Sequence, residues 1–223
     1  MANESRIPKL SDFPHEYICV DVETTGLDPN LDRMIEVAAI HVKNRDIVDR
    51  FSSLVALPDG RKVPEKIRAL TGINDDMLSG APREEKVIPE FYQFISGHVL
   101  VGHNVKFDLS FLSSACFRNG YILESESVDT LEFSKKLYKQ LKSHSLIEVA
   151  KYLGADHVEA HRAEADALMA AKCFERMRTA VTKFDDPDEM WSEASLRAIR
   201  EAKALGIHTW ELPSYRKGGG FGE

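Results

Sequence analysis

Asp21 and Glu23 are two acidic residues separated by one position, and Asp21 lies in the largely apolar, β-branched run 18–22. Such a run is typical of a buried strand. Side chains alternate between the two faces of a strand, so both carboxylates leave on the same side, with Cα atoms about 6.6 Å apart. Two acids on one face of a core strand are costly unless a cation compensates them. The pair therefore predicts a site for a divalent metal ion, which prefers oxygen ligands.

Another acidic residue that could bind a metal ion is Asp108, in the segment 100–112. A strand is predicted to end at Gly102, and Asn104 can cap the helix that follows it. Asp108 then lies one turn into this helix. The residues leave open a simpler role, in which Asp108 only interacts favourably with the helix dipole.

The third chemically informative segment is the alanine-rich stretch 160–171, which contains His161 and Asp166. Its small side chains allow a helix to approach a sheet closely. His161 is expected at the start of this helix and Asp166 about one and a half turns further on. Taken alone, His161 as a surface or capping residue and Asp166 as a solvated acid remain open.

Composition limits the class of protein. The chain has 223 residues, of which 43% are apolar and 29% charged, and this suits one globular domain with an appendage. A net charge of −7 argues against a protein that coats nucleic acid, but not against an enzyme that meets phosphates through metal ions. Cys19, Cys116 and Cys173 are scattered among apolar residues, as expected for reduced core thiols of a cytoplasmic protein. We expect no secretory signal and no membrane association, because no apolar run approaches the length of a membrane span.

Periodicity predicts an α/β fold with a mixed sheet, because a strand hairpin is followed by crossover helices. Strands are predicted at 18–22, 34–42, 47–55 and 98–101, a further strand or turn from Val128, and helices at 64–70, 84–95, 105–117, 131–141, 146–153, 163–181 and 186–205. The predicted domains are a catalytic domain at 14–182 and a C-terminal helical extension with a flexible tail at 183–223. The helix at 186–205 either covers the core or docks a partner.

Together these segments resemble the DEDDh group of 3′–5′ exonucleases, which includes the proofreading epsilon subunit of bacterial DNA polymerase III. The resemblance covers roughly residues 17–178. The family's three motifs match residues 20–27, 102–108 and 161–166, in the same order, and residues 70–73 look like a segment common in the epsilon-like branch. Agreement of motif order, spacing and predicted placement makes this match specific.

The resemblance implies a ribonuclease-H-like fold, with a mixed five-stranded sheet flanked by helices, and two Mg²⁺ ions per site, for which Mn²⁺ substitutes. By resemblance, Asp21 would bridge both metals. Glu23 and Asp166 would complete the tighter site, and Asp108 would act largely through bound water. His161 would be the general base that takes a proton from the attacking water, as a side chain that titrates near neutrality can.

The resemblance also implies substrate contacts after the first motif, from Thr24, Thr25, Gly26 and Leu27. In relatives this segment lies along the terminal nucleotide, with the apolar residue wedged between the last two bases. Here that implies contacts from the Thr25 backbone and the Leu27 side chain. A plain turn with Leu27 packed in the core is the alternative.

Residues of the second motif are further candidates for substrate contact. His103 and Asn104 are expected to shape the pocket rim or to cap the helix, and Phe107 either stacks on a base or packs internally. Asp129 is either an extra acid of the site or a turn and capping residue.

The leading functional prediction is therefore a metal-dependent 3′–5′ exonuclease that releases nucleoside 5′-monophosphates from single-stranded or frayed DNA ends. One alternative is an exoribonuclease that trims RNA 3′ ends, since no motif here decides the sugar. Another is a non-catalytic, polymerase-associated module that binds nucleic-acid ends. The expected partners are nucleic-acid 3′ ends and either a polymerase subunit or a second copy of the chain.

Overall fold

The computed structural model describes residues 6–58, 60–155 and 161–185. The chain divides into two compact units, Met1–Val181 and Thr182–Glu223. The predicted helix at 186–205 and the glycine-rich tail lie outside the described residues. The boundary predicted between residues 182 and 183 stays a prediction. Within the described part, no helix is both long and apolar enough to cross a bilayer.

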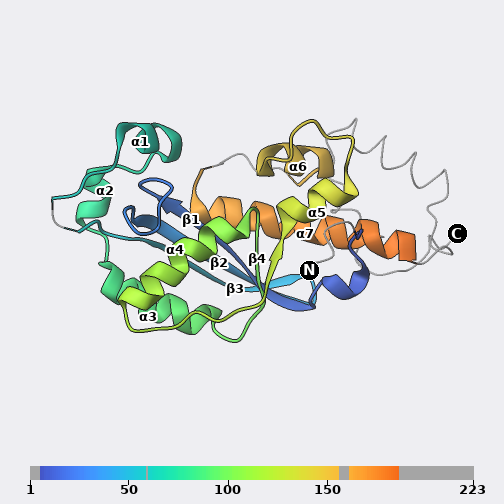
Figure 1. The fold of residues 1–223 in the computed structure, drawn as a ribbon, viewed down its shortest axis with the longest axis horizontal. Helices are drawn as coiled ribbons and strands as arrows, with labels where there is room; N and C mark the ends of the chain where they lie inside the picture. Colours follow the sequence, from blue (N-terminus) through green and yellow to red (C-terminus); the bar gives the residue numbers. More distant parts are fainter. Residues whose placement is uncertain (1–5, 59, 156–160, 186–223) are drawn as a thin grey trace, which may run out of the picture. The chain divides into compact units, whose positions relative to one another are not determined.

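The core of the first unit is a mixed five-stranded sheet, as predicted, and its strand order is β3-β2-β1-β4-β5 (Figure 1). Its strands are β1 (Glu16–Thr24), β2 (Met34–Lys43), β3 (Asp46–Leu54), β4 (Leu100–Gly102) and β5 (Ser127–Asp129). The pairs β1–β2 and β2–β3 are antiparallel, whereas β1–β4 and β4–β5 are parallel. The strand β1 is central, and residues 17–20 are fully buried because both faces of the sheet are covered.

The hairpin between β2 and β3 turns on two residues, Asn44 and Arg45. Both have positive φ angles, 51° and 73°, as in the turns whose twist matches that of paired strands. The connection is shorter than the gap between the strands predicted at 34–42 and 47–55, since Lys43 and Asp46 still pair in the ladder.

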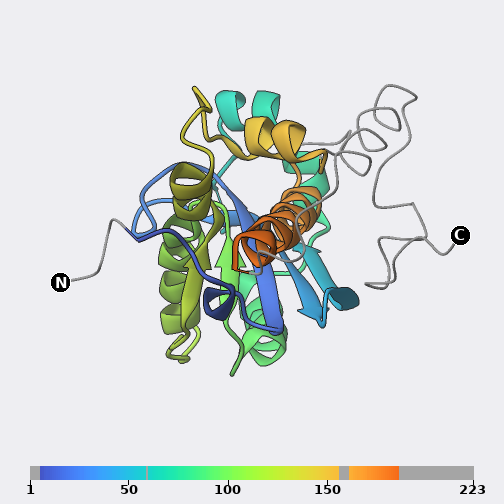
Figure 2. The same ribbon diagram turned by 90° about the vertical axis from the view of Figure 1, so that its right-hand side faces the viewer.

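Helices cover both faces of the sheet. They are α1 (Glu65–Thr71), α2 (Asp75–Ser79), α3 (Glu84–Ile95), α4 (Val105–Arg118), α5 (Thr130–Leu137), α6 (Leu146–Leu153) and α7 (Ala163–Asp185). One core cluster joins Ile18 and Val20 of β1 to α3 and α4. The other joins Tyr17 and Cys19 to α6 and α7. The orange α7 and the green α3 and α4 accordingly lie on different sides of β1 (Figure 2).

Apart from shifts of one residue, four helical segments differ from the prediction. The helix α5 ends at Leu137, not at residue 141, where the Tyr138 side chain turns into the core. The short helix α2 and a 3₁₀ turn at Leu10–Asp12 were not predicted, because five and three residues are too few to show a helical period. Asn74 caps α2 by accepting a hydrogen bond from the Met77 N–H at 3.0 Å. The helix α7 continues to Asp185 instead of ending at residue 181.

Candidate active site

The carboxylates of Asp21 and Glu23 leave β1 on the α7 side of the sheet. They alternate with Val20 and Val22, which belong to the core beneath α3 and α4. One oxygen atom from each of Asp21, Glu23 and Asp166 lies within 4.8 Å of the other two. The structure thus brings together Asp21 and Asp166, which are 145 positions apart in the chain.

Small side chains let α7 approach the sheet. Ala163 and Ala167 are fully buried, as the alanine-rich pattern predicted. The turn before the helix is held by Asp166, whose Oδ2 accepts a hydrogen bond of 3.0 Å from the His161 N–H. His161 has a φ of 68°, a left-handed conformation that is uncommon for a residue with a side chain. Its backbone is therefore fixed by the same carboxylate that faces Asp21.

Asp108 approaches the site from the opposite layer. It is buried in the first turn of α4, and its Oδ1 accepts a hydrogen bond of 3.1 Å from the Val22 N–H. This bond places Asp108 against the β1 backbone between Asp21 and Glu23. Asp108 is outside the three-carboxylate group, and its predicted action through bound water stays a prediction.

The site is electrostatically costly without a cation. Burial raises the pKa of Asp21 well above its ordinary value, and the nearby carboxylates of Asp108 and Asp166 raise it further. Burial likewise raises the pKa of Glu23 to about 7 and that of Asp108 to about 8. The pKa of Asp166 is also raised by burial, although the His161 N–H opposes this rise. An all-oxygen donor set in this state fits a hard divalent cation, which stabilises the ionised carboxylates.

Glu36 is a residue of this region that the sequence analysis missed. It lies on β2, directly opposite Glu23, and is only 2% exposed. Both of its oxygens accept hydrogen bonds from Arg162, at 3.1 Å from Nε and 2.5 Å from Nη2, and Oε2 also accepts one of 2.9 Å from the Ala163 N–H. Glu36 thereby ties β2 to the start of α7. The signal was an acid inside the apolar run 34–40.

The segment after β1 forms a loop that is held by hydrogen bonds between its own residues. The Thr25 backbone pairs with Arg33, and its Oγ1 donates to Asp32 Oδ1 at 3.1 Å. A Cβ at Gly26 would lie 2.3 Å from the Asp32 carboxylate, so any other residue there would displace Asp32 from its bonds to Thr25 and Asp28. The Thr24 hydroxyl donates to the Gly26 carbonyl at 2.6 Å.

Leu27 projects from this loop with 84% of its surface exposed. The alternative in which Leu27 packs in the core is therefore wrong. An exposed leucine on a braced loop is available to a ligand, and its predicted contact with a terminal base stays a prediction.

His103 has both ring nitrogens occupied within the protein. Its Nε2 lies 2.7 Å from the His144 carbonyl, to which it donates, and its Nδ1 lies 2.9 Å from Thr130 Oγ1. Burial lowers the pKa of His103, which favours the neutral ring. These bonds connect β4 to α5 and to the segment before α6, so His103 has a structural role whether or not it also borders the pocket.

Asn104 occupies the N-cap position of α4, but the expected side-chain capping bond is absent within the described chain. Its left-handed backbone, with a φ of 67°, instead directs its N–H to Asp129 Oδ1 at 2.9 Å. Phe107 is half-buried and packs against Phe111, with ring centroids 5.1 Å apart. Packing of Phe107 is confirmed, and base stacking by its remaining surface stays a prediction.

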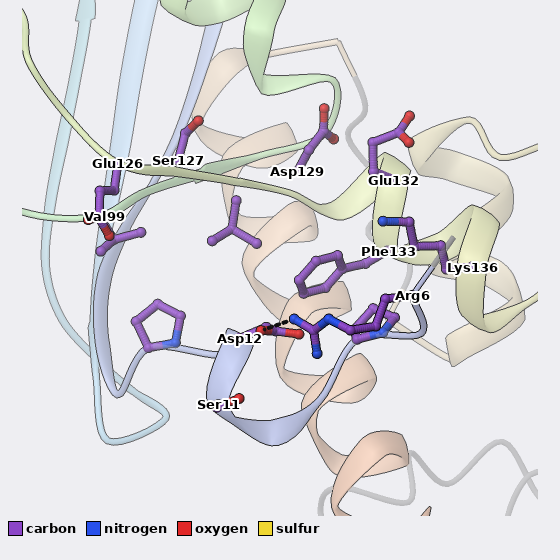
Figure 3. Close-up of a pocket in the computed structure, with 13 residues that line it drawn as sticks. Arg6, Ser11, Asp12, Val99, Glu126, Ser127, Asp129, Glu132, Phe133 and Lys136 are labelled. Atoms are coloured by element: carbon purple, nitrogen blue, oxygen red, sulfur yellow. Dashed lines mark hydrogen bonds and ion pairs between the residues drawn. The ribbon is translucent and has the colours of Figure 1, made fainter. Parts of the chain in front are cut away.

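Asp129 is a capping residue, as one of the two interpretations held. The same oxygen that binds Asn104 accepts a hydrogen bond of 2.9 Å from the Leu131 N–H at the start of α5. Asp129 also borders a separate cavity of about 530 Å³ between the N-terminal segment and α5 (Figure 3). Two basic residues, Arg6 and Lys136, and four acidic residues line this cavity, the acids being Asp12, Glu126, Asp129 and Glu132.

The fold and the site define an α/β protein that gathers acidic side chains from both helical layers at the end of its central strand. A family model described as Exonuclease (RNase_T) matches residues 18–174. The chain belongs to this exonuclease family, so the class of enzyme that the sequence predicted is confirmed. Members of the family use divalent metal ions, in agreement with the acidic group at this site.

Two relatives illustrate the range of the family. The DNA polymerase III subunit epsilon of Aquifex aeolicus is 36% identical over 159 residues, which are 71% of this chain and 78% of that protein. A PolC-type DNA polymerase III of Caldanaerobacter subterraneus is 39% identical over 164 residues, 73% of this chain but only 11% of the relative. The chain thus spans about a tenth of the PolC-type relatives it matches.

Solved structures confirm the fold. E. coli exonuclease I in complex with a dT13 oligonucleotide aligns with a TM-score of 0.67 and 20% identity, over 83% of this chain and 46% of that one. Exonuclease X in complex with 5′-overhanging duplex DNA aligns with a TM-score of 0.58 and 24% identity, over 82% and 98%. The predicted ribonuclease-H-like fold is therefore correct.

Proposed function

We propose that this chain is a Mg²⁺-dependent 3′–5′ exonuclease that removes nucleoside 5′-monophosphates from single-stranded or frayed DNA ends. The observation that carries the proposal is the convergence of Asp21, Glu23 and Asp166 oxygens within 4.8 Å of one another. Asp108, held against the β1 backbone beside them, supplies a fourth carboxylate.

Asp21, Glu23 and Asp166 would hold the metal ions directly, and Asp108 would act through water. Mg²⁺ ions held by these carboxylates would supply the positive charge that activates water and stabilises the leaving oxygen. His161 would accept the proton from that water as its oxygen attacks phosphorus. The bond from phosphorus to the 3′ oxygen breaks, and that oxygen takes up a proton to leave a new 3′-hydroxyl end.

The loop after β1 would position the terminal nucleotide. Leu27 is exposed on a loop braced by Asp32, and this suits an apolar side chain that wedges between bases. Thr24, Thr25 and Gly26 would line the backbone of the terminal nucleotide. The part of the Phe107 ring that is exposed would stack on a base.

DNA is favoured over RNA by the relatives, which are named as DNA polymerase III subunits and PolC-type polymerases. The names of the same relatives support the proposal that this chain associates with a polymerase subunit and acts in the cytoplasm. A net charge of −7 fits an enzyme that clamps one strand end better than one that follows a long duplex. Residues 14–182 would form the exonuclease domain and residues 183–223 an extension.

The test uses purified protein, Mg²⁺ and DNA labelled at its 5′ end, so that digestion from the 3′ end yields a ladder of shortening labelled products. A sealed circular strand of the same sequence is the matched control and should resist digestion. Matched RNA decides the sugar preference. Cleavage of the circle at the rate of the linear strand, or a ladder that Asp21→Asn leaves unchanged, would contradict the proposal.

A further inference from the structure

Glu16, His41 and His98 form a second group of ligand-type side chains, remote from the carboxylate site. Glu16 begins β1, His41 lies on β2, and His98 lies two residues before the start of β4, so three neighbouring segments of the sheet meet here (Figure 1). Glu16 precedes Asp21 by five strand residues, which is roughly 16 Å. It also lies on the opposite face of β1, since the two residues differ by an odd number.

The ligand atoms are close to coordination distance. His41 Nε2 lies 3.1 Å and His98 Nε2 3.9 Å from the same oxygen, Glu16 Oε1, and all three atoms lie within 4.8 Å of one another. Ligands at about 2.0–2.2 Å from a tetrahedral metal ion are about 3.3 Å apart. Small side-chain rotations would therefore bring all three atoms onto one ion.

In His98 and Glu16, the polar atom that does not face the group already has a partner within the protein. His98 Nδ1 lies 3.2 Å from the Ser96 carbonyl oxygen, which can only accept, so this nitrogen carries the proton and Nε2 presents its lone pair to Glu16. A backbone carbonyl on the second nitrogen is the usual arrangement for a histidine that binds metal. Lys43 Nζ holds Glu16 Oε2 at 2.9 Å, which leaves Oε1 facing the histidines.

The two imidazoles converge on Glu16 Oε1, with His41 Nε2 at 3.1 Å and His98 Nε2 at 3.9 Å, and their rings meet edge to face with centroids 4.8 Å apart. A cation bound between them would be coordinated by both imidazole nitrogens and by this oxygen. The ring of His41 is held in place by an edge contact with Phe94 of α3, at 6.4 Å between centroids.

We propose that Glu16, His41 and His98 bind a zinc-class transition metal ion at the end of the sheet remote from the active site. Two imidazole nitrogens and one carboxylate oxygen suit Zn²⁺, whereas Mg²⁺ prefers oxygen ligands alone. The three side chains are 19%, 38% and 29% exposed for His41, Glu16 and His98, so water can take the fourth position. The ion would join β1, β2 and the segment between α3 and β4, and would stabilise the fold. This site is independent of the proposed function.

The experiment is calorimetric titration of the full chain with Zn²⁺. The protein is first stripped of metal and then placed in excess Mg²⁺, which favours occupation of the carboxylate site by Mg²⁺. The variants are His98→Ala and Glu16→Gln, and the matched control is His15→Ala, an exposed histidine beside Glu16 but outside the group. Wild type and His15→Ala should bind one Zn²⁺, with a rise in melting temperature. His98→Ala and Glu16→Gln should each weaken binding by at least about tenfold, the lower limit seen even for groups that only support a ligand.

Two further measurements test whether the variants fold and which atoms bind the metal ion. All variants should keep Mg²⁺-dependent nuclease activity, which shows that they fold, because the group is remote from the catalytic carboxylates. Co²⁺ in place of Zn²⁺ should give the visible absorption of a site with nitrogen and oxygen ligands, and His98→Ala should abolish it. Zn²⁺ binding that His98→Ala and Glu16→Gln leave unchanged, or no binding to the wild type, would overturn the proposal.

Discussion

Asp21→Asn should stabilise the metal-free protein at pH 8 while it abolishes activity. Asp21 faces four other carboxylates, from Asp108, Asp166, Glu23 and Glu36, and burial together with these charges raises its pKa. A carboxyl group whose pKa is raised on folding contributes stability below its unfolded pKa and loses it as the pH rises towards the folded value. Asparagine is neutral at every pH and does not bear this cost.

The magnitude follows from the neighbouring Glu23. Its pKa rises from 4.5 to about 7, and at about 1.4 kcal/mol per pKa unit this corresponds to about 3 kcal/mol. Burial and neighbouring carboxylates raise the pKa of Asp21 as well. With the Glu23 figure of about 3 kcal/mol as the scale for one buried carboxylate, and about 2–4 °C of melting temperature per kcal/mol for a protein of this length, metal-free Asp21→Asn should melt about 6–12 °C above the wild type at pH 8.

The assay is thermal unfolding of wild type and Asp21→Asn at pH 4.5 and pH 8, each with and without Mg²⁺. The difference between the two proteins should nearly vanish at pH 4.5, close to the ordinary aspartate pKa of 3.8. Mg²⁺ should stabilise the wild type at pH 8 and stabilise Asp21→Asn much less. Asp46→Asn, at an exposed acid, is the control and should change little. A variant less stable than the wild type at pH 8 without metal, or equally stabilised at both pH values, would refute the reasoning.

Three further predictions concern residues around the carboxylates. His161→Ala should lower kcat by about 10²–10⁴-fold and leave Mg²⁺-induced stabilisation intact, and near-unchanged hydrolysis would remove His161 from the chemistry. Glu36→Ala should lower the free energy of unfolding by about 1–3 kcal/mol in urea, because it removes the acceptor of the buried Ala163 N–H, whereas the Arg162 side chain is 44% exposed and can be hydrated; an unchanged free energy of unfolding would contradict this. Leu27→Ala should change stability by less than about 0.5 kcal/mol, since the side chain is exposed, but should lower kcat/KM on single-stranded DNA by about 5–100-fold. Unchanged kcat/KM for Leu27→Ala would show that the loop does not contact the terminal bases.

The sequence was most informative where local rules determine geometry. A two-residue spacing in a strand is enough to place Asp21 and Glu23 on one face, and alanines at helical spacing are enough to predict the close approach of α7. The mixed sheet followed from the hairpin at residues 44–45 and the crossover helices. These features depend on neighbours in the chain, so periodicity and turn chemistry reveal them.

The features that the sequence did not reveal depend on partners far along the chain. Glu36 is held by Arg162, 126 positions away, and no local pattern pairs them. The capping bond expected from the Asn104 side chain is replaced by a backbone bond to Asp129, 25 positions away. The hydrogen bonds of His103 to Thr130 and His144 likewise arise only when β4, α5 and the segment before α6 meet.

The most direct test of the central claim is a crystal structure of the protein soaked in Mn²⁺, with the ions located by anomalous scattering. We expect two Mn²⁺ ions about 3.5–4 Å apart, held by Asp21, Glu23 and Asp166, with Asp108 linked through water. Mn²⁺ bound elsewhere, with these four carboxylates carrying no ion, would contradict the account.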